Sequence, residues 1–299
     1  MKQKHYGFTM IELLTVVAII AMLVGLLIPA LNMVRNSAKQ AKQRAQITTI
    51  DSALLAFRND YGEYPQSDYP QPPGDYCGAQ KLAEALLGWD LLGFHPNSAW
   101  RADGLDQNGG EWTYDPGKVR NGGVDSLRER KQPYLELGTA SAFKIGNASG
   151  DGLFNDTTGP LGTLNQDRFV LCDIFGVRRI TLSKGNTVIA GSPILYYKAN
   201  TSSKTIKLTD PIADRIYNAY DNQLLVVLGS LDKGMPHPIK FNGTDYPDFY
   251  GTDSGVMPFG IIRDSKVTAT KWPVRPDSYI LISAGADGLY GTSDDIKNF

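Results

Sequence analysis

The chain has little of what most active sites are built from. It contains only two cysteines and three histidines, His5, His95 and His237, in 299 residues. Neither GxSxG, HExxH, a P-loop nor GxGxxG occurs in it. This scarcity leaves little material for a histidine-based triad or a multi-histidine metal site, so we predict that the chain is not an enzyme. A membrane-tethered hydrolase that works with carboxylates stays open as an alternative.

Net charge is also small, and cysteine chemistry is restricted. The chain has 30 Lys and Arg against 31 Asp and Glu, a formal charge of -1. No global attraction for nucleic acid follows, and no nucleic-acid partner is predicted. Cys77 and Cys172 are too far apart in sequence for a metal knuckle. They could close one disulfide in an oxidising compartment, or they could be two unrelated buried thiols, and sequence does not decide between these.

What the chain does have is a long apolar run near its amino terminus. Residues 13–31 read LLTVVAIIAMLVGLLIPAL without a charge. At about 1.5 Å per residue this is long enough to cross a bilayer as a helix. A short stretch carrying Lys2 and Lys4 precedes it. A secretory signal peptide would have an A-x-A-like cleavage site after the apolar run, which is missing here. We therefore predict one helix that spans a membrane and contacts lipid.

Glu12 is out of place at the start of this run. A carboxylate near hydrocarbon costs up to about 2.5–3.5 kcal/mol unless it is paired or reaches the interface. Glu12 is therefore either a boundary residue that reaches the headgroups or a carboxylate that requires a positive partner.

The residues around Glu12 carry a resemblance to a known family. The string GFTMIELL at 7–14 resembles the processing site of type IV prepilins and type II secretion pseudopilins. The resemblance implies that a prepilin peptidase cleaves after Gly7 and methylates the new amino group of Phe8. It also implies that Glu12 pairs with the Phe8 ammonium of a neighbouring subunit. Pro29 stands where these proteins commonly carry a helix-kinking proline.

The helical pattern continues beyond the apolar run. Apolar residues recur there at spacings of three and four, which indicates one face of an amphipathic helix: Ile47, Ile50, Leu54, Phe57 and Tyr61. Gln43 and Gln46 are among the polar positions between them. We predict one helix over 8–61, about 80 Å long at 1.5 Å per residue, whose second half packs on a head domain. The expected organisation is a leader at 1–7, a transmembrane and stalk helix at 8–61, and an extracytoplasmic head at 62–299.

The head is expected to contain a sheet. Runs of β-branched and aromatic residues, punctuated by Gly, Asn and Pro, predict strands at 168–174, 179–182, 186–190, 194–198 and 278–283. Residues 79–92 predict a helix, Pro211 could open another through Tyr220, and 222–228 fits helix or strand. Together these predict an α+β, pilin-like fold in which the long helix lies against an antiparallel sheet.

The chain ends in a loop rich in aspartate and glycine. After the last predicted strand the sequence reads SAGADGLYGTSDDI at 283–296. Calcium takes six to eight oxygen ligands, and glycines let a short loop curl around an ion, although an Asp/Gly stretch is also an ordinary solvated turn. The motif resembles the calcium loop near the end of major type II secretion pseudopilins. The resemblance implies Ca²⁺ held by Asp287, Asp294 and Asp295 with carbonyls near Ala284. Many family members carry a longer insertion before the last aspartates, so the ligand set here stays open.

These patterns together predict a structural subunit of a type II secretion pseudopilus or a related type IV filament. Its expected partners are prepilin peptidase, other pilin or pseudopilin subunits bound through the amino-terminal helix, and inner-membrane assembly machinery. The alternative is a surface type IV pilus subunit for adhesion, motility or DNA uptake. The expected location is a single-pass bacterial inner-membrane protein with an extracytoplasmic head, then a filament in the periplasm or envelope. Residues 62–276 carry no motif that assigns them a role.

Overall fold

The computed structural model describes residues 9–68, 76–108, 112–114, 126–146, 152–154, 164–182, 185–204, 206, 211, 214–233, 237, 239, 247–251, 260–267 and 269–299. The chain divides into two compact units, Met1–Lys42 and Gln43–Phe299. Gly7, Phe8 and the rest of the predicted leader lie outside the described residues.

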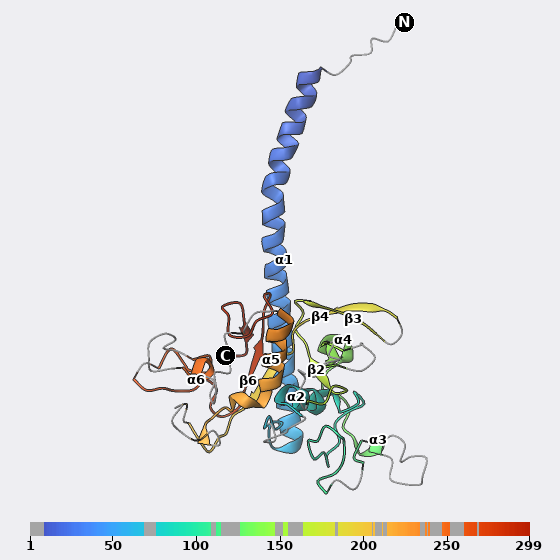
Figure 1. Ribbon diagram of the computed structural model, residues 1–299, viewed down its shortest axis with the longest axis vertical. Coiled ribbons are helices and arrows are strands. Elements are labelled where there is room, and N and C mark those ends of the chain that lie inside the picture. The colour runs from blue at the N-terminus through green and yellow to red at the C-terminus, as the bar shows by residue number, and fades with distance from the viewer. Residues whose placement is uncertain are drawn as a thin grey trace. The chain divides into compact units, whose positions relative to one another are not determined.

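The helix predicted over 8–61 is present from Met10 to Tyr61 as the 52-residue helix α1 (Figure 1). Pro29 lies inside it. The helix ends at Gly62, whose φ of +81° is a left-handed conformation that glycine adopts without strain. The Gly62 N–H donates to the Arg58 carbonyl at 2.7 Å, which satisfies one of the last helical carbonyls.

The second half of α1 buries the face that its periodicity predicts. Ile47, Ile50, Leu54 and Phe57 are all buried, whereas Tyr61 is only half-buried. They form one core with helix α2 (Gly78–Leu87) and with the buried strand β6 (Tyr279–Ser283). The expectation that this part of the helix packs on the head is confirmed.

In the part of the chain that the structure describes, the strands pair in three small antiparallel sheets rather than one. The first joins β1 (Ala142–Lys144) to β2 (Phe169–Leu171), and the second joins β3 (Arg178–Thr181) to β4 (Thr187–Ala190). The third has the order β5 (Leu195–Lys198), β6 and β7 (Ile296–Lys297), with Leu195 opposite Ile282. The α+β class and the antiparallel pairing are confirmed.

A proline marks the place where two of these sheets stop short of merging. Cys172, next to β2, and Pro193, before β5, form an isolated bridge. Ile194 still donates its N–H to the Leu171 carbonyl at 2.7 Å. The Asp173 N–H donates to the Ser192 carbonyl at 2.9 Å on the other side of the bridge. Cys172 and Pro193 are therefore a non-hydrogen-bonded pair, a position that proline occupies without loss of a hydrogen bond to β2.

The remaining helices are short, and two expectations need correction. They are α3 (Ser126–Glu129), α4 (Leu137–Ala140), the 3₁₀ helix η3 (Ala219–Asn222), α5 (Gln223–Lys233) and α6 (Pro247–Tyr250). The helix predicted over 79–92 stops at Leu87, because Gly88 has a φ of +94°. The α-helix predicted from Pro211 to Tyr220 is wrong for its described residues, of which only Asp214 and the start of η3 are helical, both in 3₁₀ conformation. The ambiguous segment 222–228 belongs mainly to α5.

The two cysteines are free thiols, so the disulfide that the sequence left open is not formed. Cys77 precedes α2 and Cys172 follows β2, and both are fully buried in the same apolar core cluster. Burial raises the pKa of Cys77 to about 12 and raises that of Cys172 as well. Both groups are therefore protonated and poorly reactive near neutral pH.

Candidate functional site

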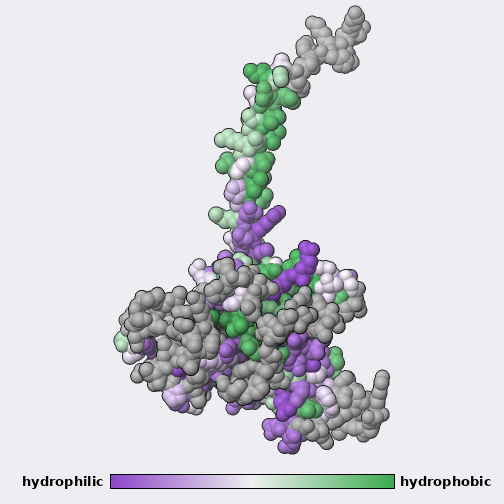
Figure 2. All heavy atoms as spheres, in the orientation of Figure 1, coloured by the Kyte–Doolittle hydropathy of each residue, from purple (hydrophilic) through white to green (hydrophobic). Residues whose placement is uncertain are grey.

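The amino-terminal part of α1 is apolar on all its sides. Its large apolar side chains from Met10 to Val34 are exposed (Figure 2, green). Among the described residues, α1 is the one helix long and apolar enough to cross a membrane, and its most apolar window has no buried residue. A helix that is hydrophobic all round and exposed to this extent fits a lipid or helical-bundle environment better than water.

Glu12 has a local role that the sequence reasoning missed. Its carboxylate accepts the Thr9 N–H at 2.9 Å and the Thr9 hydroxyl at 2.7 Å. In return the Glu12 N–H donates to the Thr9 hydroxyl oxygen at 3.3 Å. This is a capping box, which satisfies two amide groups at the exposed start of α1. The Thr-x-x-Glu spacing at 9–12 was the signal that predicts it. The predicted partner of Glu12 is the Phe8 ammonium of a neighbouring subunit, and Phe8 lies outside the described residues.

The carboxy-terminal loop links β6 to β7 and is built around Asp294. One oxygen of its carboxylate accepts the N–H groups of Ala286 at 2.7 Å and Asp287 at 3.0 Å. The Thr292 hydroxyl donates to the other oxygen. Burial opposes ionisation, but these hydrogen bonds outweigh it and hold the pKa of Asp294 below its usual value. Asp294 therefore holds the loop together as an anion.

Glycines give this loop its tight course. Gly285, Gly288 and Gly291 have φ angles of +67°, +70° and +90°. Other residues adopt this region only with strain. At Gly285 a Cβ atom would also lie 2.4 Å from the Asp294 carbonyl oxygen, so a side chain there would displace the loop.

Asp295 is the most unusual side chain in the loop, because it is only 1% exposed. One oxygen accepts the Gly291 N–H at 2.9 Å and lies 3.9 Å from the Lys297 ammonium. The other oxygen is buried and accepts no hydrogen bond from the described residues. Burial raises the pKa of Asp295 to about 7, although the Gly291 N–H and Lys297 oppose the shift. An unsatisfied buried oxygen of this kind requires a cation, a proton or water.

A polar cleft of about 360 Å³ borders Asp295. Its lining comes from α1, the loop and the end of the chain: Arg44, Thr292, Ser293, Asp295, Ile296, Lys297 and Phe299. Within the described part of the chain, no three His, Cys, Asp or Glu side chains are grouped so that they could hold a metal ion. Of the three predicted calcium ligands, Asp295 has a buried carboxylate oxygen without a described partner, whereas Asp287 is exposed and accepts the Leu289 N–H at 2.8 Å with one oxygen.

The comparison with known families concerns the amino terminus. Residues 2–28 match the family model described as the prokaryotic N-terminal methylation motif. This chain carries a prepilin-type amino terminus. The motif indicates a type IV pilin-like protein that prepilin peptidase processes and that assembles with other pilin subunits, and it points to a structural subunit rather than an enzyme. No curated protein and no solved structure shows significant similarity to the chain.

In this pilin-like chain two buried glutamines tie α1 to the head. Gln46 donates a hydrogen bond from its amide to the Cys172 carbonyl at 3.0 Å. The Ile174 N–H donates to the amide oxygen of Gln43 at 3.0 Å. By polarity alone, both glutamines are surface positions between the apolar ones. Their positions in the helix predict burial, because each lies four residues before a buried isoleucine and so faces the core.

A second polar contact fixes the end of the chain to α1. Asp51 accepts hydrogen bonds from the Tyr279 hydroxyl at 2.7 Å and from the Asn298 amide at 3.0 Å. Asn298 in turn accepts the Leu281 N–H at 2.9 Å through its side-chain oxygen. The segment that follows the Asp/Gly loop is therefore bound to both the long helix and the central strand β6.

Proposed function

We propose that the chain is a structural subunit of a type II secretion pseudopilus or a related type IV filament of the cell envelope. The observation that carries this proposal is the methylation motif at 2–28, joined to a helix whose amino-terminal side chains are apolar and exposed on every side. The subunit is made as a single-pass inner-membrane precursor with an extracytoplasmic head. It then leaves the bilayer by packing its helix among those of other subunits.

Cleavage after Gly7 is the step that prepares the chain for assembly. It creates an ammonium group at Phe8, next to the exposed apolar surface of α1. When subunits pack their helices together, this ammonium pairs with Glu12 of a neighbour, which partly compensates for burying two charges in an apolar setting. Thr9 supports this arrangement, because its hydrogen bonds hold the Glu12 carboxylate at the helix start.

Mass spectrometry of the mature amino terminus tests the processing step. The full-length chain, expressed in a host with an active prepilin peptidase, is expected to begin at an N-methylated Phe8. Replacement of Gly7 by a bulky residue, for example Gly7→Leu, should leave the precursor intact. A chain that still begins at Met1 in the wild type, or that is cut after the apolar run, contradicts the proposal.

Deletion of this subunit should have different effects in the secretion role and in the surface-pilus role. A pseudopilus subunit is expected to be required for the release of secreted proteins from the periplasm. A surface pilus subunit is instead required for long external fibres. Retained periplasmic cargo with unchanged fibres supports the secretion role, and loss of external fibres with normal secretion supports the pilus alternative.

For the carboxy-terminal loop we propose calcium binding. The support is the buried oxygen of Asp295, which has no partner among the described residues, in a loop whose other groups are oxygens of Asp287, Asp294 and backbone carbonyls near Ala284. Calcium prefers such hard oxygen ligands. When bound, the ion supplies positive charge to Asp295 and stabilises the folded loop between β6 and β7, because it binds the folded state only.

A further inference from the structure

The apolar part of α1 is followed by three cations that have no acid near them in the sequence. Residues 13–34 carry no charge, and residues 35–50 contain no Asp or Glu. Arg35, Lys39 and Lys42 come first after the uncharged run and belong to the same compact unit, Met1–Lys42. Figure 2 shows hydrophilic side chains (purple) on α1 beyond its hydrophobic stretch (green). We call the three cations the basic stripe.

The side chains of the basic stripe lie on one face of the helix. At 3.6 residues per turn, spacings of four and three residues place them within about 60° of one another around the axis. All three are exposed. In the described part of the chain none of them forms an ion pair or a side-chain hydrogen bond, whereas Lys198 of the head lies 2.9 Å from Glu63. The basic stripe therefore carries three uncompensated positive charges.

The basic stripe begins where the hydrocarbon core of a bilayer would end. The uncharged run at 13–34 is about 33 Å long as a helix, which matches a hydrocarbon core of about 30 Å. Arg35, Lys39 and Lys42 lie about 1.5, 7.5 and 12 Å beyond this run along the axis. The headgroup layer on each side is about 5–7 Å thick. Helical side chains tilt toward the amino terminus, so all three long side chains can reach the headgroups.

The position of these charges favours an anionic lipid as the partner. Lys2 and Lys4 precede the span, but they lie in the leader that the proposed cleavage after Gly7 removes. The cations that remain beside the span then lie on its extracytoplasmic side, although an excess of Lys and Arg is usual on the cytoplasmic side. Polybasic segments next to a span attract anionic headgroups. A second copy of the chain is a less favourable partner, because parallel helices would bring two basic stripes together.

We propose that the basic stripe binds anionic phospholipid headgroups at the membrane face beyond Val34 and so sets the depth of the helix before assembly. The proposal rests on the membrane insertion proposed above and adds the class of lipid that the span selects. The attraction is between the phosphate of the lipid and the ammonium and guanidinium groups of the stripe. Zwitterionic lipids carry no net charge and are bound less tightly.

The test is electron spin resonance on the full-length chain reconstituted in phosphatidylcholine bilayers. Lipid next to the protein moves more slowly than bulk lipid, so spin-labelled phosphatidylglycerol and phosphatidylcholine report their relative association. The wild type should favour phosphatidylglycerol about fivefold or more, the preference that one cation near an anionic surface supplies. NaCl at about 1 M should remove most of it. Free glycerol phosphate at constant ionic strength should not compete, because it lacks the acyl chains that hold the lipid beside the stripe.

Two triple variants locate the binding. Arg35→Gln/Lys39→Gln/Lys42→Gln removes the charges and should abolish the preference for phosphatidylglycerol. Arg35→Lys/Lys39→Arg/Lys42→Arg keeps the charges and should keep the preference. Intact-mass measurement confirms that all samples share the same state of the leader, so that Lys2 and Lys4 contribute equally to each.

The matched control removes three exposed cations of the head instead: Lys131→Gln/Arg179→Gln/Lys266→Gln. Its change in net charge is the same as that of the first triple variant. The control should favour phosphatidylglycerol as the wild type does, because the sites lie outside the basic stripe.

Each other outcome overturns the proposal. Equal association of both lipids with the wild type refutes it, and so does a preference that the Gln variant of the stripe retains. Competition by glycerol phosphate would indicate a general phosphate site. Self-association that the Gln variant weakens, without any lipid preference, would assign the stripe to an interface between copies. These results leave processing at Gly7 untouched, since mass spectrometry reads it separately. A chain that floats with neither type of vesicle contradicts membrane insertion itself.

Discussion

The side-chain amide of Gln46 donates a hydrogen bond to the backbone carbonyl of Cys172, a residue 126 positions later in the chain (3.0 Å). Gln46 is 5% exposed, and Cys172 follows β2 in the apolar core. A buried carbonyl that loses its donor is costly, because water cannot replace it there. Gln46 thus fixes where the long helix meets the head.

Replacing this glutamine should destabilise the head. Gln46→Ala leaves the Cys172 carbonyl without its side-chain donor and opens a small cavity, so we expect a loss of about 1–3 kcal/mol in the free energy of unfolding. Gln40→Ala, at an exposed position of the same helix, should change stability by less than about 0.5 kcal/mol. Denaturant unfolding of the full-length chain in detergent measures both. Equal effects at the two positions would show that the hydrogen bond to Cys172 does not matter.

The aromatic centre of the core offers a test of helix packing. Phe57 of α1 is buried, with its ring centroid 5.0 Å from that of Phe94. Phe57→Ala should cost about 3–5 kcal/mol because it removes a large buried side chain. The neighbouring Leu55 is 49% exposed, and Leu55→Ala should cost far less. Thermal unfolding followed by circular dichroism distinguishes them, and similar losses would contradict the assignment of the buried face.

These contacts show which parts of the fold can be predicted from the sequence. The spacing of Ile47, Ile50, Leu54 and Phe57 is local information, and it predicted the buried face of α1. The run SYILIS predicted β6 for the same reason. The isolated bridge between Cys172 and Pro193, at which two of the three sheets meet, joins separate segments, and no local pattern contains it. Gln43 and Gln46 were missed because polarity alone assigned them to the surface, although their helical positions face the core.

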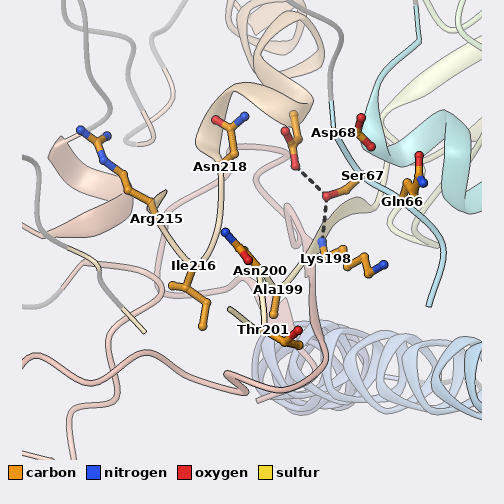
Figure 3. A pocket seen from close by; sticks show the side chains of 11 residues that line it. Gln66, Ser67, Asp68, Lys198, Ala199, Asn200, Thr201, Arg215, Ile216 and Asn218 are labelled. Carbon is orange, nitrogen blue, oxygen red and sulfur yellow. Dashed lines mark hydrogen bonds between the residues drawn. The ribbon is translucent and has the colours of Figure 1, made fainter. Parts of the chain in front are cut away.

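The candidate sites also differ in how much of them the sequence predicts. The motif around Gly7, Phe8 and Glu12 was readable because its spacing is fixed along one segment, and the family match supports that reading. The individual roles in the carboxy-terminal loop were not readable. Composition treats Asp294 and Asp295 alike, whereas the fold gives one a set of hydrogen-bond donors and buries the other. A cleft of about 450 Å³, whose lining includes Ser67, Asn200 and Asn218 (Figure 3), is formed by three segments far apart in the chain and has no sequence signature.

Glu84 should make stability depend on pH. This buried carboxyl accepts hydrogen bonds from the hydroxyls of Tyr76 at 2.6 Å, Tyr114 at 2.7 Å and Ser98 at 2.5 Å. Burial raises its pKa above 4.5, although the hydroxyl groups oppose the shift. A raised pKa means that the folded state binds the proton more tightly than the unfolded state does. This contribution to stability is therefore complete below about pH 4 and is lost as pH rises through the folded pKa.

The variant that isolates this effect is Glu84→Gln. Glutamine does not titrate, so the free energy of unfolding should fall less steeply above about pH 4 than in the wild type. Urea unfolding at several pH values measures the slope. Glu136→Gln, at an exposed site before α4, is the control and should leave the slope unchanged. If the free energy of unfolding changes with pH to the same extent in the wild type, Glu84→Gln and Glu136→Gln, a raised Glu84 pKa is contradicted.

The free thiols predict an absence of redox dependence. Because Cys77 and Cys172 are buried and protonated, a reducing agent should leave Tm unchanged, and a thiol reagent should label neither residue quickly in the native protein. Both should react after denaturation, which intact-mass spectrometry counts directly. A mass two hydrogens lighter that reverts on reduction would reveal the disulfide and contradict this structure.

Removal of one carboxylate tests the proposed ion in the carboxy-terminal loop. In the wild type, calcium at about 100 times its Kd should add about 2.7 kcal/mol to the stability of the folded state, measured as a rise in Tm over a chelator-treated sample. Asp295→Asn should abolish that rise. It should also leave the chelated protein as stable as the wild type or more so, because it removes the negative charge of a buried carboxylate.

The matched control is Asp167→Asn, a carboxylate at an exposed position outside the loop, which should keep the full calcium response. Magnesium separates the ion's charge from its coordination, since it prefers fewer ligands and rigid octahedral geometry. An equal response to both ions would indicate charge screening at Asp295 rather than a calcium site. A wild-type Tm that calcium does not move would refute calcium binding in the loop while leaving the amino-terminal processing untouched, because that part of the chain depends on Gly7, Phe8 and Glu12 alone.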